Sequence, residues 1–231
     1  MKQLSIKTAD GTAPAFEFGS GPSVLMFIDG IGMRPAMHEI GERLGKAGYR
    51  VLMPDLFYRI GPYEPIVPAQ LMSDPAVRGA WFAKLRATPV ASYLVDTRAY
   101  LEHLDGPVGT TGYCMGGRLS IVAAATYPER IVAAAAYHPG GLVSDGPDSP
   151  HLLVPNIKAS VYVGGAMDDE TFTAEHAATL EAALTAAHVD HVIEAYPAKH
   201  GWVPSDTVVH DPVQAERHWQ TLLALLAKHL H

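Results

Sequence analysis

Gly112-Tyr113-Cys114-Met115-Gly116-Gly117 (GYCMGG, residues 112–117) is the stretch that decides the fold, because it joins a predicted strand to a predicted helix. Residues 107–111 before it read as a strand. Residues 115–127 after it are small and helix-forming, and Pro128 ends that helix. A strand that turns directly into a helix is typical of proteins in which helices cover a sheet.

The alternation of strands and helices extends over most of the chain. Short apolar runs predict strands that are buried on both faces, and apolar residues three or four apart predict helices. The chain is therefore predicted to have an α/β fold, a mostly parallel central sheet with helices on both faces. The predicted strands are residues 23–29, 50–54, 107–111, 131–137, 159–164 and 191–196, and the predicted helices are residues 35–47, 90–104, 115–127, 173–187 and 212–229.

No linker or repeat divides the sequence, so we expect a single domain over residues 1–231 without a separate lid domain. Residues 56–75 are rich in Pro, Gly and Tyr, lack clear periodicity and are predicted to form an irregular binding loop.

The composition excludes several classes of protein. The 231 residues include 17 Lys and Arg against 24 Asp and Glu, a net charge of −7, which argues against nucleic-acid and polybasic membrane binders. The single cysteine excludes a disulfide framework and a four-cysteine zinc site, and fits a reducing compartment. No apolar run reaches the ~20 residues that span a bilayer. We expect a cytoplasmic protein, a monomer or a small homo-oligomer.

The cysteine stands where a G-x-S-x-G nucleophile elbow has its serine. Such a turn holds the nucleophile in a sharp, strained conformation that only flanking glycines, without Cβ atoms, can accommodate. The turn also places the sulfur at a helix N-terminus, where the partial positive charge favours a thiolate. The alternative is that Cys114 is a small buried hydrophobic residue, the usual state of a free cysteine.

A thiol nucleophile needs a base, and the base needs a carboxylate to orient it. In α/β-hydrolases these groups follow the nucleophile in the order acid, then histidine. The predicted strand 159–164 leads into Asp168-Asp169-Glu170, and the last predicted strand leads to His200. His138 also follows a strand, but it precedes the acid in the chain, which favours His200 as the base.

Together these residues resemble the dienelactone hydrolase family of α/β-hydrolases. The resemblance rests on the elbow, on Pro54-Asp55-Leu56-Phe57-Tyr58-Arg59, on the Asp169 loop, and on Tyr196-Pro197 followed by His200-Gly201-Trp202. It implies the α/β-hydrolase fold and a triad of Cys114, Asp169 and His200. Asp169 is preferred to Asp168 because the family acid is followed, three residues on, by a bulky apolar residue, here Phe172.

The resemblance also implies roles around the triad. Asp29 occupies the place of a family carboxylate that interacts with the resting thiol; the alternative is a charge at a helix N-terminus. The oxyanion hole is expected at the backbone N–H groups of Met115 and of Gly30, or of Ile31 in place of Gly30.

The sequence defines the substrate less closely. Relatives that act on dienelactone hold its carboxylate with arginines, one of them shortly after the catalytic histidine, and no arginine stands shortly after His200. We expect Tyr58 and Trp202, with Phe57 and Trp81, to make an apolar pocket, unless they belong to the core. Arg59 is a candidate for binding an anionic group, or a surface cation.

These observations predict a hydrolase that cleaves a small ester or lactone through a thioester on Cys114, without metal or organic cofactor. Two other classes of protein are alternatives. A nucleotide-binding protein is disfavoured because Pro35 stands at the third glycine of the motif that begins Gly30-Ile31-Gly32. A non-catalytic thiol sensor or ligand-binding protein on a hydrolase scaffold stays open. His188 and His191 are too isolated to predict a zinc site.

Overall fold

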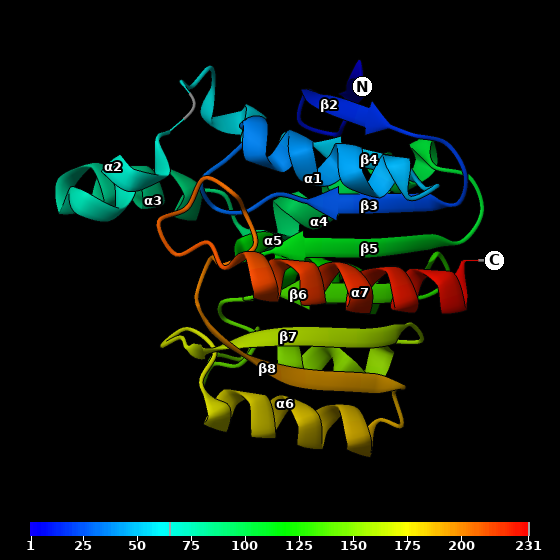
Figure 1. Ribbon diagram of the computed structural model, residues 1–231. Helices are drawn as coiled ribbons and strands as arrows, with labels where there is room; N and C mark the ends of the chain where they lie inside the picture. Colours follow the sequence, from blue (N-terminus) through cyan, green and yellow to red (C-terminus); the bar gives the residue numbers. More distant parts are fainter. Residues whose placement is uncertain (65, 231) are drawn as a thin grey trace.

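The computed structural model describes residues 1–64 and 66–230, and of Met72 only the backbone. Within these residues one sheet has the strand order β1-β2-β4-β3-β5-β6-β7-β8 (Figure 1). Strands β3 to β8 pair in parallel, whereas β2 pairs antiparallel with both β1 and β4. The strands are β1 (Lys2–Lys7), β2 (Thr12–Phe18), β3 (Ser23–Phe27), β4 (Arg50–Pro54), β5 (Val108–Tyr113), β6 (Ile131–Tyr137), β7 (Ser160–Asp168) and β8 (His191–Lys199).

Helices cover both faces of this sheet, which confirms the predicted α/β class. Helices α1 (Pro35–Lys46) and α7 (Pro212–His229) lie on one face, and α4 (Val90–His103) and α5 (Met115–Thr126) lie on the other (Figure 1). Helix α6 (Ala174–Ala186) packs against β8 and the 3-10 helix η2 (Pro150–Asn156). In the described part of the chain, no helix is long and apolar enough to cross a bilayer.

The N-terminal strands β1 and β2 were not predicted from the sequence. Only Ile6 is buried in β1, which forms the edge of the sheet, so its sequence lacks the apolar run of a central strand. In β2 the buried positions Ala13, Ala15 and Phe18 include two alanines, which give a weak hydrophobic signal.

The prediction that residues 56–75 form an irregular loop is wrong in part. The segment contains the 3-10 helix η1 (Tyr58–Ile60) and helix α2 (Pro68–Ser73), and helix α3 (Pro75–Arg86) follows directly. Position 65 lies outside the described residues. In α3 only Trp81 and Leu85 are buried, too few to produce a helical periodicity in the sequence.

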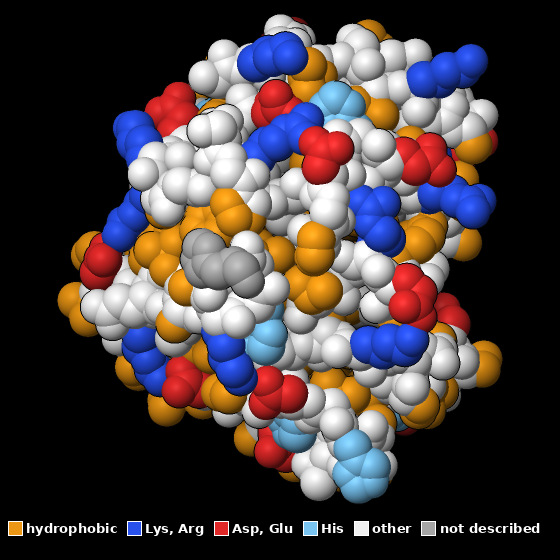
Figure 2. Space-filling view, turned by 90° about the vertical axis from the view of Figure 1, so that its right-hand side faces the viewer, with side chains coloured by type: hydrophobic (Ala, Val, Ile, Leu, Met, Phe, Trp, Pro, Cys, Tyr) orange, Lys and Arg blue, Asp and Glu red, His pale blue; other side chains and the backbone are white. Residues whose placement is uncertain are grey.

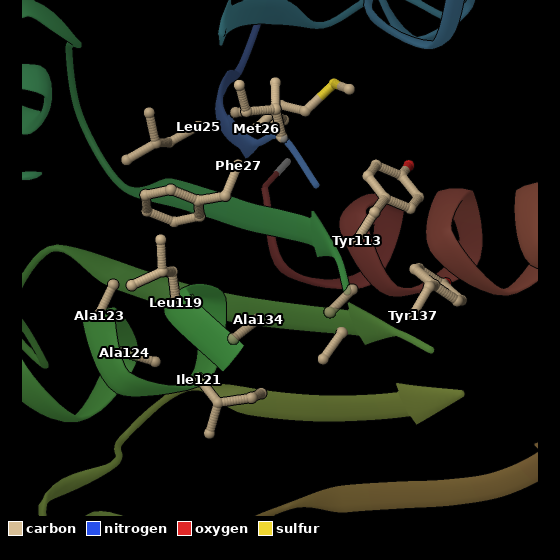
Figure 3. Close-up of a cluster of buried hydrophobic side chains, with 14 of the residues drawn as sticks. Leu25, Met26, Phe27, Tyr113, Leu119, Ile121, Ala123, Ala124, Ala134 and Tyr137 are labelled. Carbon is tan, nitrogen blue, oxygen red and sulfur yellow. The ribbon is translucent and has the colours of Figure 1, made fainter. Parts of the chain in front are cut away.

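The core lies between the central strands and the helices that cover them. Figure 3 shows one part of it, where Leu25 and Phe27 of β3 and Leu119 of α5 are fully or almost fully buried. Leu71, Trp81 and Leu85 of α2 and α3 belong to the same buried cluster. These two helices therefore pack onto the main core.

The carboxyl ends of the parallel strands lie at one end of the molecule. Helices α2 and α3 and the loop between β8 and α7 cover this end, on the left in Figure 1. Figure 2 shows the opposite end, where acidic and basic side chains are interspersed and leave no extended patch of one sign. Polar groups that follow the parallel strands are thus gathered at one end of the sheet, where such folds bind ligands.

The turn between β5 and α5 depends on two close backbone approaches. A Cβ atom at Gly112 would lie 2.0 Å from the carbonyl oxygen of Gly116. A Cβ atom at Gly116 would lie 2.4 Å from the carbonyl oxygens of both Phe27 and Ile28. These contacts press α5 against the ends of β3 and β5, so the glycines fix where the helix begins.

We predict that Gly116→Ala destabilises the protein by about 3 kcal/mol, because a methyl group would have to displace backbone atoms. Gly79→Ala in helix α3 is the matched control, since a Cβ atom at Gly79 would meet nothing within 4 Å. The control should raise stability by up to about 1 kcal/mol through helix propensity. Thermal and urea unfolding measure both variants. Equal stability of the two would contradict the packing argument.

Candidate active site

Cys114 occupies a strained turn at the carboxyl end of β5. Its backbone angles are φ 54° and ψ −117°, a region that costs a non-glycine residue about 1–3 kcal/mol. The turn is held by hydrogen bonds from the Cys114 N–H to the Tyr137 carbonyl (3.0 Å) and from the Gly117 N–H to the Cys114 carbonyl (3.1 Å). The cysteine is partly exposed and caps helix α5, so its sulfur stands at a helix N-terminus.

His200 and Asp169 come together beside this turn. The His200 Nδ1 atom lies 2.6 Å from Asp169 Oδ2, and the Asp169 side chain is 1 % exposed. The backbone N–H and the hydroxyl of Thr171 donate to Asp169 Oδ1, at 2.8 and 2.7 Å. Asp168 instead points to solvent, 74 % exposed, with its carboxylate 3.6 Å from Lys199. Of the two adjacent carboxylates, only Asp169 orients the imidazole.

The charges of these groups are coupled. Burial lowers the pKa of His200, but the negative charge of Cys114, a hydrogen bond with Cys114 and the Asp169 carboxylate together raise it to about 10. Burial raises the pKa of Asp169, but its hydrogen bond and charge interaction with His200 lower the pKa below its usual value. The raised pKa of His200 and the lowered pKa of Asp169 therefore favour an imidazolium paired with a carboxylate at neutral pH.

The loop after β3 presents its backbone to the thiol. The Ile31 N–H donates to Asp29 Oδ1 (2.9 Å), so it is occupied, which leaves the Gly30 N–H as the candidate oxyanion-hole donor of this loop. The Gly30 carbonyl accepts a buried hydrogen bond of 2.7 Å from the Trp81 indole N–H. The peptide between Gly30 and Ile31 is thus held at both ends. Met115, the other predicted donor, is the first residue of α5.

Asp29 differs from the expectation that it interacts with the thiol. It lines the cavity beside Cys114, but both carboxylate oxygens are bound by the Arg34 guanidinium, at 2.7 and 2.9 Å. Its side chain is 4 % exposed and that of Arg34 is 2 % exposed. Both oxygens of Asp29 are therefore engaged by Arg34.

Two cavities meet at Cys114 and share Gly30 and Phe82. The first, which we call the histidine cavity, has a volume of about 120 Å³ and contains His200 and His138. The second, the arginine cavity, has a volume of about 230 Å³ and contains Arg86 and Arg118. The apolar wall of the histidine cavity is formed by Ile31, Pro68, Leu71, Phe82, Val208 and Val209.

The other predicted substrate residues lie elsewhere. Arg59 is bound by Asp96 and by Asp10, and the Tyr58 hydroxyl contacts Thr8 and Asp96. Tyr58 and Arg59 line cavities that do not include Cys114. The expectation that they bind substrate beside the thiol is therefore corrected, because a salt bridge holds Arg59 near the N-terminal strands.

The expectation that Trp202 lines the substrate pocket is also corrected, since this residue belongs to the core. Its side chain is fully buried and stacks on Tyr196, with ring centroids 4.9 Å apart. Phe57 and Trp81 are buried as well and pack edge to face. Phe82 lines both cavities, and Tyr93 lines the arginine cavity.

His138, the competing base, is fully buried with its ring 5.2 Å from that of His200. Burial lowers its pKa well below the usual value, and the charge of His200 adds to this effect, so His138 stays neutral. Neither of its ring nitrogens has a hydrogen-bond partner among the described residues, so no carboxylate there orients it as Asp169 orients His200.

Sequence reasoning missed Arg34, Trp81 as a hydrogen-bond donor, and the two arginines of the second cavity. The sequence could have indicated Arg118, because it lies in α5, one helical turn after Cys114. Arg34 and Trp81 act through contacts distant in sequence, which no local motif marks. Within the described residues, no three His, Cys, Asp or Glu side chains are grouped as a metal site would require.

Comparisons with known proteins show the family of this chain. The model of the dienelactone hydrolase family matches residues 12–230. The chain belongs to the dienelactone hydrolase family. A carboxymethylenebutenolidase from Rhodococcus opacus is 24 % identical over 223 residues, which cover 92 % of this chain and 83 % of the relative. The membership identifies the protein as an ester or lactone hydrolase of the dienelactone hydrolase type.

Solved structures show the same fold. A "Putative Dienelactone Hydrolase" from Klebsiella pneumoniae superimposes with a TM-score of 0.85 at 23 % identity, covering 99 % of this chain and 98 % of the other. A thioesterase domain from the curacin biosynthetic pathway gives a TM-score of 0.70 at 12 % identity, covering 97 % and 99 % of the two chains. These likenesses confirm the α/β-hydrolase fold.

The Asp169–His200 pair should make stability depend on pH. The raised pKa of His200 stabilises the fold below the unfolded-state pKa of about 6.5, and this stabilisation is lost as pH rises towards 10. The lowered pKa of Asp169 stabilises the fold above about pH 4 and is lost below it. We predict that the difference in Tm between wild type and Asp169→Asn is largest between about pH 4 and 6.5.

Asp168→Asn is the matched control, because it removes the same charge from an exposed neighbour. Differential scanning fluorimetry from pH 4 to 10 should show little change in Tm for this variant. A difference for Asp169→Asn that does not vary with pH would contradict the ion-pair description.

Proposed function

We propose that the protein hydrolyses a small ester or lactone through a Cys114–His200–Asp169 triad and a thioester intermediate. The observation that carries the proposal is the hydrogen bond between Asp169 and His200 in a cavity that His200 shares with Cys114, with the cysteine in the strained turn before α5. A nucleophile, a base and a carboxylate that orients the base are the parts that acyl transfer requires.

The first half of the reaction forms the thioester. His200 holds the proton of Cys114 on the ring nitrogen that does not face Asp169, and the thiolate attacks the carbonyl carbon. The tetrahedral intermediate collapses with cleavage of the bond between carbon and the alcohol oxygen. The leaving oxygen takes the proton from His200, and the acyl group stays on sulfur.

The second half releases the acid. His200 accepts a proton from water while the water oxygen attacks the thioester carbonyl. The second tetrahedral intermediate expels the thiolate, which forms the ion pair with the imidazolium again. With a lactone, the alcohol and the acid remain in one molecule, so the product is a hydroxy acid.

Both tetrahedral intermediates carry a negative oxygen, and the Gly30 and Met115 N–H groups are the proposed donors. The Met115 N–H belongs to the start of α5, where the helix dipole adds to the stabilisation. The Gly30 N–H lies in a loop, so the direction in which it points depends on the hydrogen bonds that hold that loop.

The cavities support a small substrate with the thiol at its middle. The histidine cavity is narrow and largely apolar, which suits a short acyl or ring portion. The arginine cavity supplies positive charge on the other side of Cys114, although no arginine stands shortly after His200. The cytoplasmic location and the monomeric or small oligomeric state stay predictions.

We predict that Cys114→Ala abolishes hydrolysis of p-nitrophenyl acetate, because the attacking atom is removed. Asp169→Asn should lower kcat by about 100-fold or more by releasing the imidazole from its orientation. Asp168→Asn should leave kcat within about twofold. Acid-quenched wild type should carry an acetyl group on Cys114 in mass spectrometry. Turnover by Cys114→Ala would refute the proposal.

We predict that Trp81→Phe lowers kcat by about 10-fold with little change in KM. The variant keeps an aromatic ring but leaves the buried Gly30 carbonyl without its donor, so the oxyanion loop loses its fixed direction. Trp219→Phe in α7, whose ring packs against Arg43 outside both cavities, is the control. An equal effect of the two substitutions would contradict the role of the Gly30 peptide.

A non-catalytic thiol sensor or ligand-binding protein is the alternative. It predicts that Cys114 reacts rapidly with iodoacetamide while a panel of lactones and short-chain esters shows no Cys114-dependent turnover. The proposed function predicts turnover of at least one member of that panel.

A further inference from the structure

Arg34 connects the two loops that flank the thiol. It follows the oxyanion loop and precedes α1, and its side chain is 2 % exposed. On one side it binds Asp29, and on the other it binds Asp206, which lies in the loop that begins at His200. These loops are about 170 residues apart in sequence, and no motif marks the connection.

Every N–H group of this guanidinium has an acceptor. Nη1 donates to Asp29 Oδ1 (2.7 Å) and to the Gly32 carbonyl (3.1 Å), and Nη2 donates to Asp29 Oδ2 (2.9 Å) and Asp206 Oδ1 (3.2 Å). Nε donates to Asp206 Oδ2 (2.7 Å). Arginine has five such donors in a planar array, so only arginine can bridge two carboxylates in this way.

Each end of the bridge reaches a part of the proposed active site. Asp29 also accepts from the Ile31 N–H and, more weakly, from the Gly32 N–H, which fixes the loop that carries Gly30. Asp206 directly precedes Thr207, Val208 and Val209, which line the histidine cavity together with His200. A shift at Arg34 would therefore move both the oxyanion loop and the cavity wall.

The charges explain why the bridge is stable when buried. Burial lowers the pKa of Arg34, but the carboxylates of Asp29 and Asp206 raise it above its usual value, so the guanidinium stays charged. One cation between two anions leaves one negative charge, and the Asp206 side chain is 31 % exposed to solvent. The fully buried half of the network, Arg34 with Asp29, is neutral overall.

We propose that Arg34 is a positioning residue for hydrolysis, which through Asp29 and Asp206 holds the oxyanion loop and the His200 loop at a fixed distance across Cys114. This rests on the proposed function and assigns Asp29 to the structure of the loop, with the proton of Cys114 held by His200. Misplacement of catalytic groups by about 1 Å can cost roughly 100-fold in rate.

The sharpest test removes only the link to the His200 loop. Asp206→Ala deletes two hydrogen bonds at a partly exposed site, and Asp206→Asn keeps an acceptor for one of them. We expect kcat for p-nitrophenyl acetate to fall about 10-fold or more in Asp206→Ala and by less in Asp206→Asn, with KM within about threefold. Ser205 lies on the same loop and donates a hydrogen bond to Glu39 of α1, so Ser205→Ala, which loses that bond, should retain the wild-type kcat.

A second readout needs no substrate. The rate at which iodoacetamide alkylates Cys114 at pH 7 reports the pairing of the thiol with His200, and it should also fall in Asp206→Ala and not in Ser205→Ala. Circular dichroism at the assay temperature confirms that each variant is folded. Arg34→Lys, with one donor atom, should reduce kcat as Asp206→Ala does.

The outcomes separate this inference from the proposed function. If wild type hydrolyses esters and Asp206→Ala matches it in both kcat and alkylation rate, the positioning role is overturned. The role is also overturned if Asp206→Ala and Ser205→Ala lose activity only in proportion to their loss of Tm. If wild type hydrolyses no ester but alkylation falls in Asp206→Ala alone, the bridge stands and the proposed hydrolysis fails.

Discussion

The strained backbone at Cys114 is the constraint from which the site follows. With φ at 54°, the chain reverses from β5 into α5 within one residue and brings the sulfur to the start of the helix. The conformation persists because Gly112 and Gly116 allow the helix to approach the ends of β3 and β5 more closely than any Cβ would permit. The strain at Cys114 is offset by the packing of α5 against the carboxyl ends of the central strands.

Electrostatics at the site is arranged in two separate networks. Asp169 and His200 form an ion pair beside Cys114, in which the pKa of His200 is raised, and the His200 side chain has partial access to solvent. Arg34 neutralises Asp29 in a second, buried network. The charge of Asp29 is thus paired, and the wall of the histidine cavity is largely apolar.

The sequence is informative where function depends on local geometry. The elbow requires glycines at fixed positions around one residue, so the spacing of Gly112 and Gly116 is enough to single out Cys114. Central strands such as 131–137 are predicted with the bounds observed for β6, because both of their faces are buried. The edge strand β1 and helix α3 were missed, since they bury one and two side chains respectively.

The substrate side of the site could not be predicted, because its walls come from segments that meet only in the fold. Tyr58 and Arg59 belong to a family-like motif, yet Arg59 forms salt bridges with Asp10 and Asp96, away from Cys114. Phe82 and Arg86 lie on a helix without clear periodicity, and they reach Cys114 because Trp81 and Leu85 anchor that helix in the core. A motif specifies the reacting atoms, whereas long-range burial and buried polar contacts decide what surrounds them. Variation in α2, α3 and the His200 loop can therefore change the substrate while the proposed triad stays in place.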